Sequence, residues 1–250
     1  MILAIDVGNT NVVMGCVESG KVLGTSRMNT VRNDLPNDYA IKMRQCFELD
    51  NIDAKKIEGV IMSSVVPPVT EAIKIAVKKL LGLDCLVVGS GIKTGIDIKI
   101  DDPATAGPDL ITGAVGALAK FEPPIVIIDM GTATTLFAVD GNRAFCGGAI
   151  LPGVKLSYSA LSSGTSLLPV ISINNAPKKV ISTNTVDCME SGAIFGTAAM
   201  VDGMVDRMET ELGQPVTAVA TGGIAGHIIP YCKRKVEYEP DLILYGLEII

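Results

Sequence analysis

The amino-acid sequence predicts an α/β protein made of two similar halves, each with a mixed sheet. The first observation is a repeat: Ile2–Asn11 and Ile125–Thr134 are both apolar runs that end in Asp-x-Gly and continue into small polar residues. The second is the spacing, since Asp6 and Asp129 are 123 positions apart in a chain of 250 residues. The third is that strand, hairpin and helix patterns follow in the same order after each repeat, which is typical of an α/β fold.

Each repeated segment leads into a hairpin pattern. Apolar runs flank a short turn that contains Gly, Asn, Asp or Ser, the residues that tight hairpin turns favour. The expected strands and turns are Val12–Val17, Glu18–Gly20 and Lys21–Gly24 in the first half, and Leu136–Val139, Asp140–Asn142 and Arg143–Cys146 in the second.

A second correspondence follows later in each half. Gly59–Pro67 and Val216–Ile224 both resemble a strand that runs into small residues and then into a helix. Two prolines at the end of Lys120–Pro124 cannot continue a helix, so we expect the boundary there, between halves 1–119 and 120–250. Other segments are assigned as helices 39–49, 70–81, 108–120 and 186–211, and as a polar loop over 174–185.

Composition excludes several classes of partner. The formal net charge is −6, the basic residues are scattered, and aromatic residues make up 4% with no Trp, so we expect no nucleic-acid partner. No run of about 18 apolar residues occurs, so we expect no membrane span. The chain opens on a predicted strand without a basic leader, and we therefore expect a cytoplasmic protein.

Cysteine and histidine usage limits the chemistry. The six cysteines form no CxxC pair, which argues against a zinc site and favours buried free thiols. His227 is the one histidine, so a carboxylate is the expected base in any proton transfer. Neither GxxxxGK[ST] nor a GxGxxG that follows a strand occurs, which excludes the usual P-loop and Rossmann patterns.

The paired Asp-x-Gly turns suggest binding of a nucleoside triphosphate. An Asp at a strand end is suited to a hydrated divalent cation, and the following Gly permits close approach of the backbone to phosphate. The Thr221–Gly223 turn opens a further helix, where a nucleoside and phosphate fit. Each turn alone is more often a plain turn, so the prediction depends on the three occurring together.

Taken in order, the motifs resemble those of the type III pantothenate kinases. The matching segments are Asp6–Asn11, Gly107–Asp109, Asp129–Thr135, Gly147–Gly153, Thr185–Val186 with Ser191–Gly192, Thr221–Gly223 and the tail Asp241–Leu247. This resemblance spans the chain and implies an actin-like fold with two ribonuclease-H-like domains. It also implies transfer of the terminal phosphoryl group of ATP to the primary hydroxyl of pantothenate, which opens coenzyme A synthesis.

The resemblance further implies a homodimer that uses Mg²⁺ and a monovalent cation, K⁺ or NH₄⁺. It assigns Asp109 as the catalytic base, Asp129 to the monovalent cation and Asp6 to Mg²⁺ through ATP. The residues implied at ATP are Asp6, Val7, Gly8, Asn9, Thr10, Asn11, Val12, Val13, Thr132, Gly222 and Gly223. Those implied at the acceptor substrate are Ile100, Gly107, Pro108, Leu110 and Thr185.

Physical reasoning also supports Asp109, which follows Gly107–Pro108 at an expected helix start. The helix dipole favours an ionised carboxylate there, and such a group accepts a hydroxyl proton. Phosphoryl transfer needs little base strength, because positioning and charge neutralisation supply most of the catalysis. An alternative is that Asp109 only improves the helix start.

Four positions near Asp109 differ from the family pattern, namely Ile100, Asp102, Leu110 and Gly113, where Tyr, Asn, Arg and Asn are usual. Two alternatives therefore stay open: a kinase of another small hydroxyl compound, and a nucleotide-binding regulator without turnover. For the dimer, the small-residue helix Ser191–Met200 is the expected interface, although a buried core helix has the same pattern.

Overall fold

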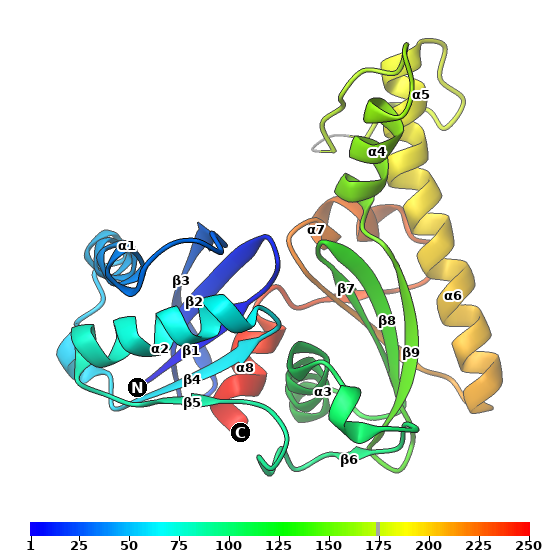
Figure 1. Ribbon diagram of the computed structural model, residues 1–250. Coiled ribbons are helices and arrows are strands. Elements are labelled where there is room, and N and C mark those ends of the chain that lie inside the picture. Colours follow the sequence, from blue (N-terminus) through cyan, green and yellow to red (C-terminus); the bar gives the residue numbers. More distant parts are fainter. Residues whose placement is uncertain (174–175) are drawn as a thin grey trace. The chain divides into compact units, whose positions relative to one another are not determined.

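The computed structural model describes residues 1–173 and 176–250, which form two compact units (Figure 1). The first contains Met1–Ile96, Asp101–Ala119 and Asp241–Ile250, and the second contains Asp97–Ile100 and Lys120–Pro240. Each unit has one mixed sheet covered by helices, so the predicted α/β class is confirmed.

The first unit has a five-stranded sheet in the order β3-β2-β1-β4-β5. β1 pairs with β2 antiparallel and with β4 parallel, and this places the Asp6 turn at one end of the sheet. The strands are β1 (Ile2–Val7), β2 (Asn11–Glu18), β3 (Lys21–Asn29), β4 (Gly59–Ser64) and β5 (Cys85–Val87).

The second unit repeats this arrangement in a six-stranded sheet, β11-β10-β7-β8-β9-β6. Read from β9 to β11 its order matches β3 to β5, and β7 again pairs antiparallel with β8 and parallel with β10. The repeat predicted from sequence is therefore a repeat of topology. The strands are β6 (Asp97–Ile98), β7 (Ile125–Met130), β8 (Ala133–Val139), β9 (Ala144–Pro152), β10 (Thr217–Thr221) and β11 (Glu237–Tyr238).

Helices cover both faces of the first sheet. Alternate residues of β1 (Leu3, Ile5 and Val7) pack in one apolar core with α1 (Pro36–Leu49) and α2 (Pro67–Leu81), while Ala4 packs in another with α8 (Leu242–Ile249). α3 (Pro108–Lys120) packs on α8 through glycine, since a Cβ added at Gly116 would lie 2.5 Å from the Leu242 carbonyl oxygen. The short helices are η1 (Ala54–Lys56) and η2 (Pro103–Thr105).

In the second unit, α6 (Thr197–Leu212) packs Ala198, Val201 and Val205 against the apolar face of β7. The helix expected over 186–211 is present in three consecutive pieces: α5, a π-helical turn and α6. The remaining helices are α4 (Val154–Ser163), α5 (Thr185–Ser191), η3 (Gly192–Gly196, π), α7 (Ala225–Ile228) and η4 (Ile229–Tyr231). No helix in the described part of the chain is long and apolar enough to cross a membrane.

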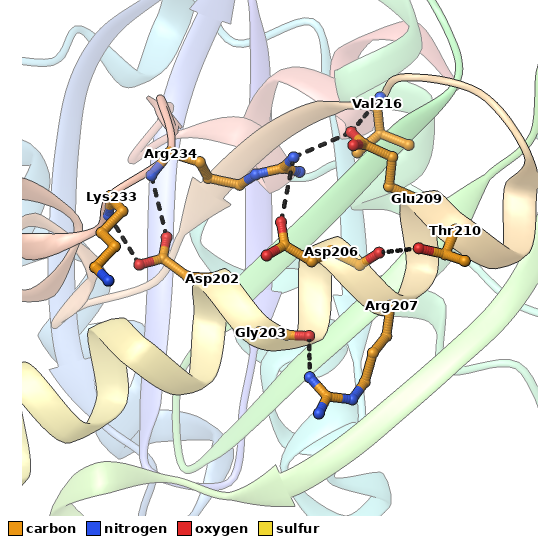
Figure 2. A network of polar contacts seen from close by, with 9 residues as sticks. All are labelled: Asp202, Gly203, Asp206, Arg207, Glu209, Thr210, Val216, Lys233 and Arg234. Atoms are coloured by element: carbon orange, nitrogen blue, oxygen red, sulfur yellow. Dashed lines mark hydrogen bonds and ion pairs between the residues drawn. The ribbon is translucent and has the colours of Figure 1, made fainter.

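A polar network links α6 to the segments before and after β10 (Figure 2). Asp202 accepts hydrogen bonds from the backbone N–H groups of Lys233 and Arg234, at 2.8 and 3.2 Å. Glu209 accepts from the Val216 N–H at 3.0 Å and from the Arg234 guanidinium at 3.1 Å. The network therefore anchors the chain on both sides of β10, the strand that carries Thr221.

The two units do not coincide with the predicted halves 1–119 and 120–250. Residues 241–250 belong to the first unit, because Leu244 and Leu247 of α8 fill the core beside Ala4. Residues 97–100 belong to the second, because β6 adds to its sheet beside β9. Of the loop predicted over 174–185, residues 174–175 lie outside the described part, and α5 already begins at Thr185.

Candidate functional site

The first Asp-x-Gly turn joins β1 to β2 and is supported by the end of β3. Gly8 N–H donates to the Asn11 carbonyl at 3.0 Å, and the Thr30 hydroxyl donates to the Gly8 carbonyl at 2.7 Å. Asn9 and Thr10 are exposed at the tip, with Arg32 donating to the Asn9 side chain at 3.1 Å. The result is a narrow turn with an exposed polar tip, as phosphate binding by backbone requires.

Three residues expected at ATP have apolar side chains that serve the core. Val7 and Val12 are completely buried in the core shared with α1 and α2. Val13 packs against the core shared with α8. At these positions only the backbone is suited to contact a phosphate.

Asp109 lies at the start of α3 in a partly buried position. Burial raises the pKa of its carboxyl group, and the hydrogen bond that Oδ1 accepts from the Leu110 N–H, at 2.9 Å, opposes this increase. A Cβ added at Gly107 would lie 2.5 Å from Asp109 Oδ1, so the carboxylate takes the space that a side chain there would need. A carboxylate with a raised pKa is a stronger proton acceptor than an ordinary aspartate.

The expected acceptor-site residues fall into two groups. Gly107, Pro108 and Leu110 lie with Asp109 in the first unit, whereas Ile100 and Thr185 belong to the second. Thr185 is exposed at the start of α5, next to the capping residue Asn184. Of the other positions that differ from the family pattern, Asp102 caps η2 by accepting from the Ala104 N–H at 3.0 Å, and Gly113 is buried in α3.

The second Asp-x-Gly turn and the Thr221–Gly223 turn meet at Asp129. Gly222 has φ +95°, and a Cβ added there would lie 2.6 Å from Asp129 Oδ1 and from the Met130 nitrogen. Only glycine fits at this place, both for its backbone conformation and for its space. Gly153 N–H donates to the Thr132 carbonyl at 3.1 Å, which fixes the other side of the turn.

Two threonines flank Asp129, each within a motif segment but without a site role of its own above. Thr135 on β8 and Thr221 on β10 are both in register with Asp129, so their side chains share its face of the sheet. Within residues 1–173 and 176–250 the buried Thr135 hydroxyl has no hydrogen-bond partner, and Thr221 donates to the Pro240 carbonyl at a long 3.4 Å. Register across strands identifies both, which spacing along the chain does not.

These oxygen atoms fit a hard cation. Carboxylate and hydroxyl oxygens are the ligands that such ions prefer. Among residues 1–173 and 176–250, no three His, Cys, Asp or Glu side chains cluster as a metal site. Any cation at Asp129 would therefore depend on hydroxyl, carbonyl or nucleotide oxygens as further ligands.

A cavity of about 350 Å³ lies elsewhere in the second unit, beside α4. Its lining residues include none of those expected at ATP or at the acceptor. They are Lys155, Tyr158, Ser159, Val170, Ile171, Ser172 and Ile173.

Comparison with known proteins assigns the family. The sequence pattern of the family described as type III pantothenate kinase matches residues 2–207. The chain belongs to the type III pantothenate kinase family. A member from Exiguobacterium sp. (strain AT1b) is 39% identical over 250 residues, which is 100% of this chain and 98% of that protein. Another member, from Exiguobacterium sibiricum, is 40% identical over 250 residues, which is again 100% of this chain and 98% of that protein.

A solved structure shows the fold at lower identity. Component A of the (R)-2-hydroxyglutaryl-CoA dehydratase of Acidaminococcus fermentans is 14% identical, with a TM-score of 0.60. The match covers 99% of this chain and 95% of that one. The chain therefore has the predicted fold of two ribonuclease-H-like domains, which actin-like ATPases and sugar kinases share.

Proposed function

We propose that this chain transfers the terminal phosphoryl group of ATP to the primary hydroxyl of pantothenate, the first step of coenzyme A biosynthesis. The observation that carries the proposal is the family match over residues 2–207, and the partly buried carboxyl group of Asp109, whose pKa is raised, supports this residue as the proposed base. Because the chain belongs to a kinase family, we expect it to be an enzyme. We expect its substrate, pantothenate, to be a small molecule. We expect the protein to work in the cytoplasm.

In this mechanism Asp109 takes the proton from the acceptor hydroxyl as its oxygen bonds to the γ-phosphorus and the bond to ADP breaks. The turn around Gly8 would hold phosphate oxygens, and Thr132, Gly222 and Gly223 would contact ATP on the second unit. Asp6 would hold Mg²⁺ through ATP, and such an ion would supply neutralisation of the charge on the transferring group. Since the transition state is loose, these residues act mainly by positioning and by charge neutralisation.

A monovalent cation, K⁺ or NH₄⁺, belongs to the proposal at Asp129. The carboxylate and the neighbouring hydroxyls of Thr135 and Thr221 supply hard oxygen ligands on one face of the sheet. The cation would offset the charge of the phosphates beside the Gly222 turn.

A kinase of another small hydroxyl compound is the second candidate. The observation in its favour is Leu110, an apolar and half-buried side chain next to Asp109, where the family usually has Arg. Leu cannot pair with a carboxylate, and a hydrogen bond to a charged group contributes about 1.5–3 kcal/mol. A nucleotide-binding regulator without turnover is the outcome if no acceptor is phosphorylated.

An assay of ATP consumption against a panel of acceptors separates these candidates. The panel contains pantothenate and other hydroxyl acids, alcohols and amides. We expect turnover with pantothenate, and Leu110→Arg combined with Ile100→Tyr should lower its Michaelis constant. Efficient turnover of another acceptor by the wild type, lost in the double variant, would instead assign that substrate.

We also propose a homodimer formed by the second unit. Large apolar side chains are exposed along α4 and the segment that follows it, a surface that pairing of two copies would bury. In the expected interface helix, Ala193, Ile194 and Ala198 are core residues, whereas Gly196 and Ala199 are exposed. The exposed apolar residues are Leu156, Leu161, Leu167, Val170, Val180 and Ile181, here called the α4 patch.

A further inference from the structure

Ser63, near the end of β4, has a buried hydroxyl without a partner. The residue is 0% exposed, and within the described part of the chain its Oγ forms no hydrogen bond. A buried polar atom without a partner destabilises a fold, and such atoms are rare in native proteins. A role with a ligand would explain why Ser is present here instead of Ala.

The position of Ser63 points to that ligand. In the parallel ladder of β1 and β4, Ser63 is in register with Asp6, so the two side chains lie next to each other on one face of the sheet. Towards the strand starts this face is apolar, with Ala4 and Ile61 in the core beside α8. Asp6 and Ser63 are therefore the polar pair at the strand ends.

The neighbouring serine shows that local structure does not need the Ser63 hydroxyl. Ser64 Oγ lies 2.6 Å from Thr70 Oγ1 and accepts from the Val66 N–H at 3.2 Å, which supports the start of α2. Ser63 has no such task. The second unit repeats the arrangement, because Thr221 is in register with Asp129 as Ser63 is with Asp6.

We infer that Ser63 is a binding residue for the hydrated Mg²⁺ of ATP, with its hydroxyl hydrogen-bonded to a water molecule of the ion that Asp6 holds. The inference rests on the proposed function, in which Asp6 binds Mg²⁺ through ATP. A serine hydroxyl both donates and accepts, so it pairs with a metal-bound water and with the carboxylate at once. When Mg²⁺ binds, its water molecule would provide the hydrogen-bond partner that the Ser63 hydroxyl lacks in the described part of the chain.

Binding of a non-hydrolysable ATP analogue, measured by calorimetry with excess Mg²⁺ and again with EDTA, tests the inference. Ser63→Ala should weaken binding about 3- to 10-fold with Mg²⁺, the range of one hydrogen bond, and leave binding in EDTA unchanged. Its melting temperature without ligand should equal or exceed that of the wild type. Ser63→Thr, which keeps the hydroxyl, should retain the Mg²⁺-dependent affinity.

Thr134 offers a matched control, since it is also 0% exposed and its hydroxyl has no hydrogen-bond partner among the residues that the structure describes. Its register neighbour Met130 lies in the apolar core of the second unit. Thr134→Val should therefore raise the melting temperature and leave both dissociation constants unchanged.

The possible results distinguish a failure of the Ser63 inference from a failure of the proposed function. Equal affinities of the wild type and Ser63→Ala with Mg²⁺ overturn the inference alone, as does an equal loss with Mg²⁺ and with EDTA. Should Ser63→Ala not fold, Ser63→Cys takes its place, because a thiol is a weak hydrogen-bonding group. If the wild type binds no nucleotide in Mg²⁺, the proposed function fails, and the inference fails with it.

Discussion

At the scale of one residue, Asp109 is both the base that we propose and a partly buried carboxyl group with a raised pKa. We expect Asp109→Asn to lower turnover by about 10²- to 10⁴-fold, the usual contribution of a general base. Because burial raises the pKa of this carboxyl, its ionised form destabilises the fold. The variant should therefore melt above the wild type at pH 7 to 8.

The pH dependence of that difference checks the assignment. The wild-type carboxyl gains its proton as pH falls through the raised pKa, so the difference in melting temperature should shrink and vanish below the ordinary value of 3.8. Wild-type turnover should fall over the same interval as the base is protonated. Unchanged turnover in Asp109→Asn would assign the residue to the helix start alone.

Gly222 determines where the Asp129 carboxylate lies. We expect Gly222→Ala to impair nucleotide binding and cation use by about 10-fold or more, because the new Cβ would lie 2.6 Å from Asp129 Oδ1. Gly213→Ala is the control, since Gly213 also has positive φ, +71°, with no atom within 4 Å of the added Cβ. Both variants should lose about 1–2 kcal/mol through backbone strain, and Gly222→Ala should lose more because its Cβ would also clash with the Met130 backbone. A matching loss of activity in the control would contradict the assignment.

At the scale of elements, the α6 network makes stability depend on pH. Hydrogen bonds from the Val216 N–H and the Arg234 guanidinium hold the pKa of Glu209 below its ordinary value of 4.5. The stabilisation is therefore present above that value and is lost as pH falls through the lower pKa in the fold. Glu209→Gln should melt a few degrees below the wild type at pH 7, and the two melting temperatures should converge as pH falls below the lowered pKa of Glu209. A constant difference over pH 3 to 7 would contradict this.

Elements that depend on local sequence could be predicted, and those that depend on distant partners could not. The hairpins after Asp6 and Asp129 have turn residues between apolar runs, so their strands follow from pattern. β6 and β11 have two residues each, and their pairing with β9 and β10 depends on the fold. α8 is apolar on most positions, so its sequence does not show which core it fills.

The same limit applies to the site. The motifs locate Asp6, Asp109 and Asp129, because each occurs at an expected strand or helix end. Ser63 and Thr135 matter only through register with an aspartate on a neighbouring strand. Register depends on how strands align in space, so a single sequence without its structure does not identify these hydroxyls.

At the scale of the whole molecule, the α4 patch predicts the oligomeric state. Light scattering at micromolar concentration should give twice the chain mass of 26.1 kDa. Ile181→Glu, which places a charge on a side chain that is 86% exposed, should shift the mass towards the monomer. Leu49→Glu, on α1 of the first unit and 80% exposed, should leave the mass unchanged. A monomeric wild type would reject the dimer.

A requirement for a monovalent cation is the second property of the whole enzyme that we predict. Turnover should be several-fold higher in K⁺ or NH₄⁺ than in tetramethylammonium buffer, because the large organic ion cannot replace an ion bound at Asp129. Thr135→Val should raise the K⁺ concentration for half-maximal turnover, with little change at saturating K⁺. Equal rates in both buffers would exclude the cation site.

α8 also determines the order in which the cores close during synthesis. Residues 120–240 leave the ribosome before α8, so the second unit has its strands and helices complete first. Until α8 follows, Ala4, Ile61 and Val88 lack the leucines that bury them, although β1 is made before any strand of the second unit. The first unit therefore completes its core only after residues 120–240 have been made, and its open face is where a nascent chain needs protection from aggregation.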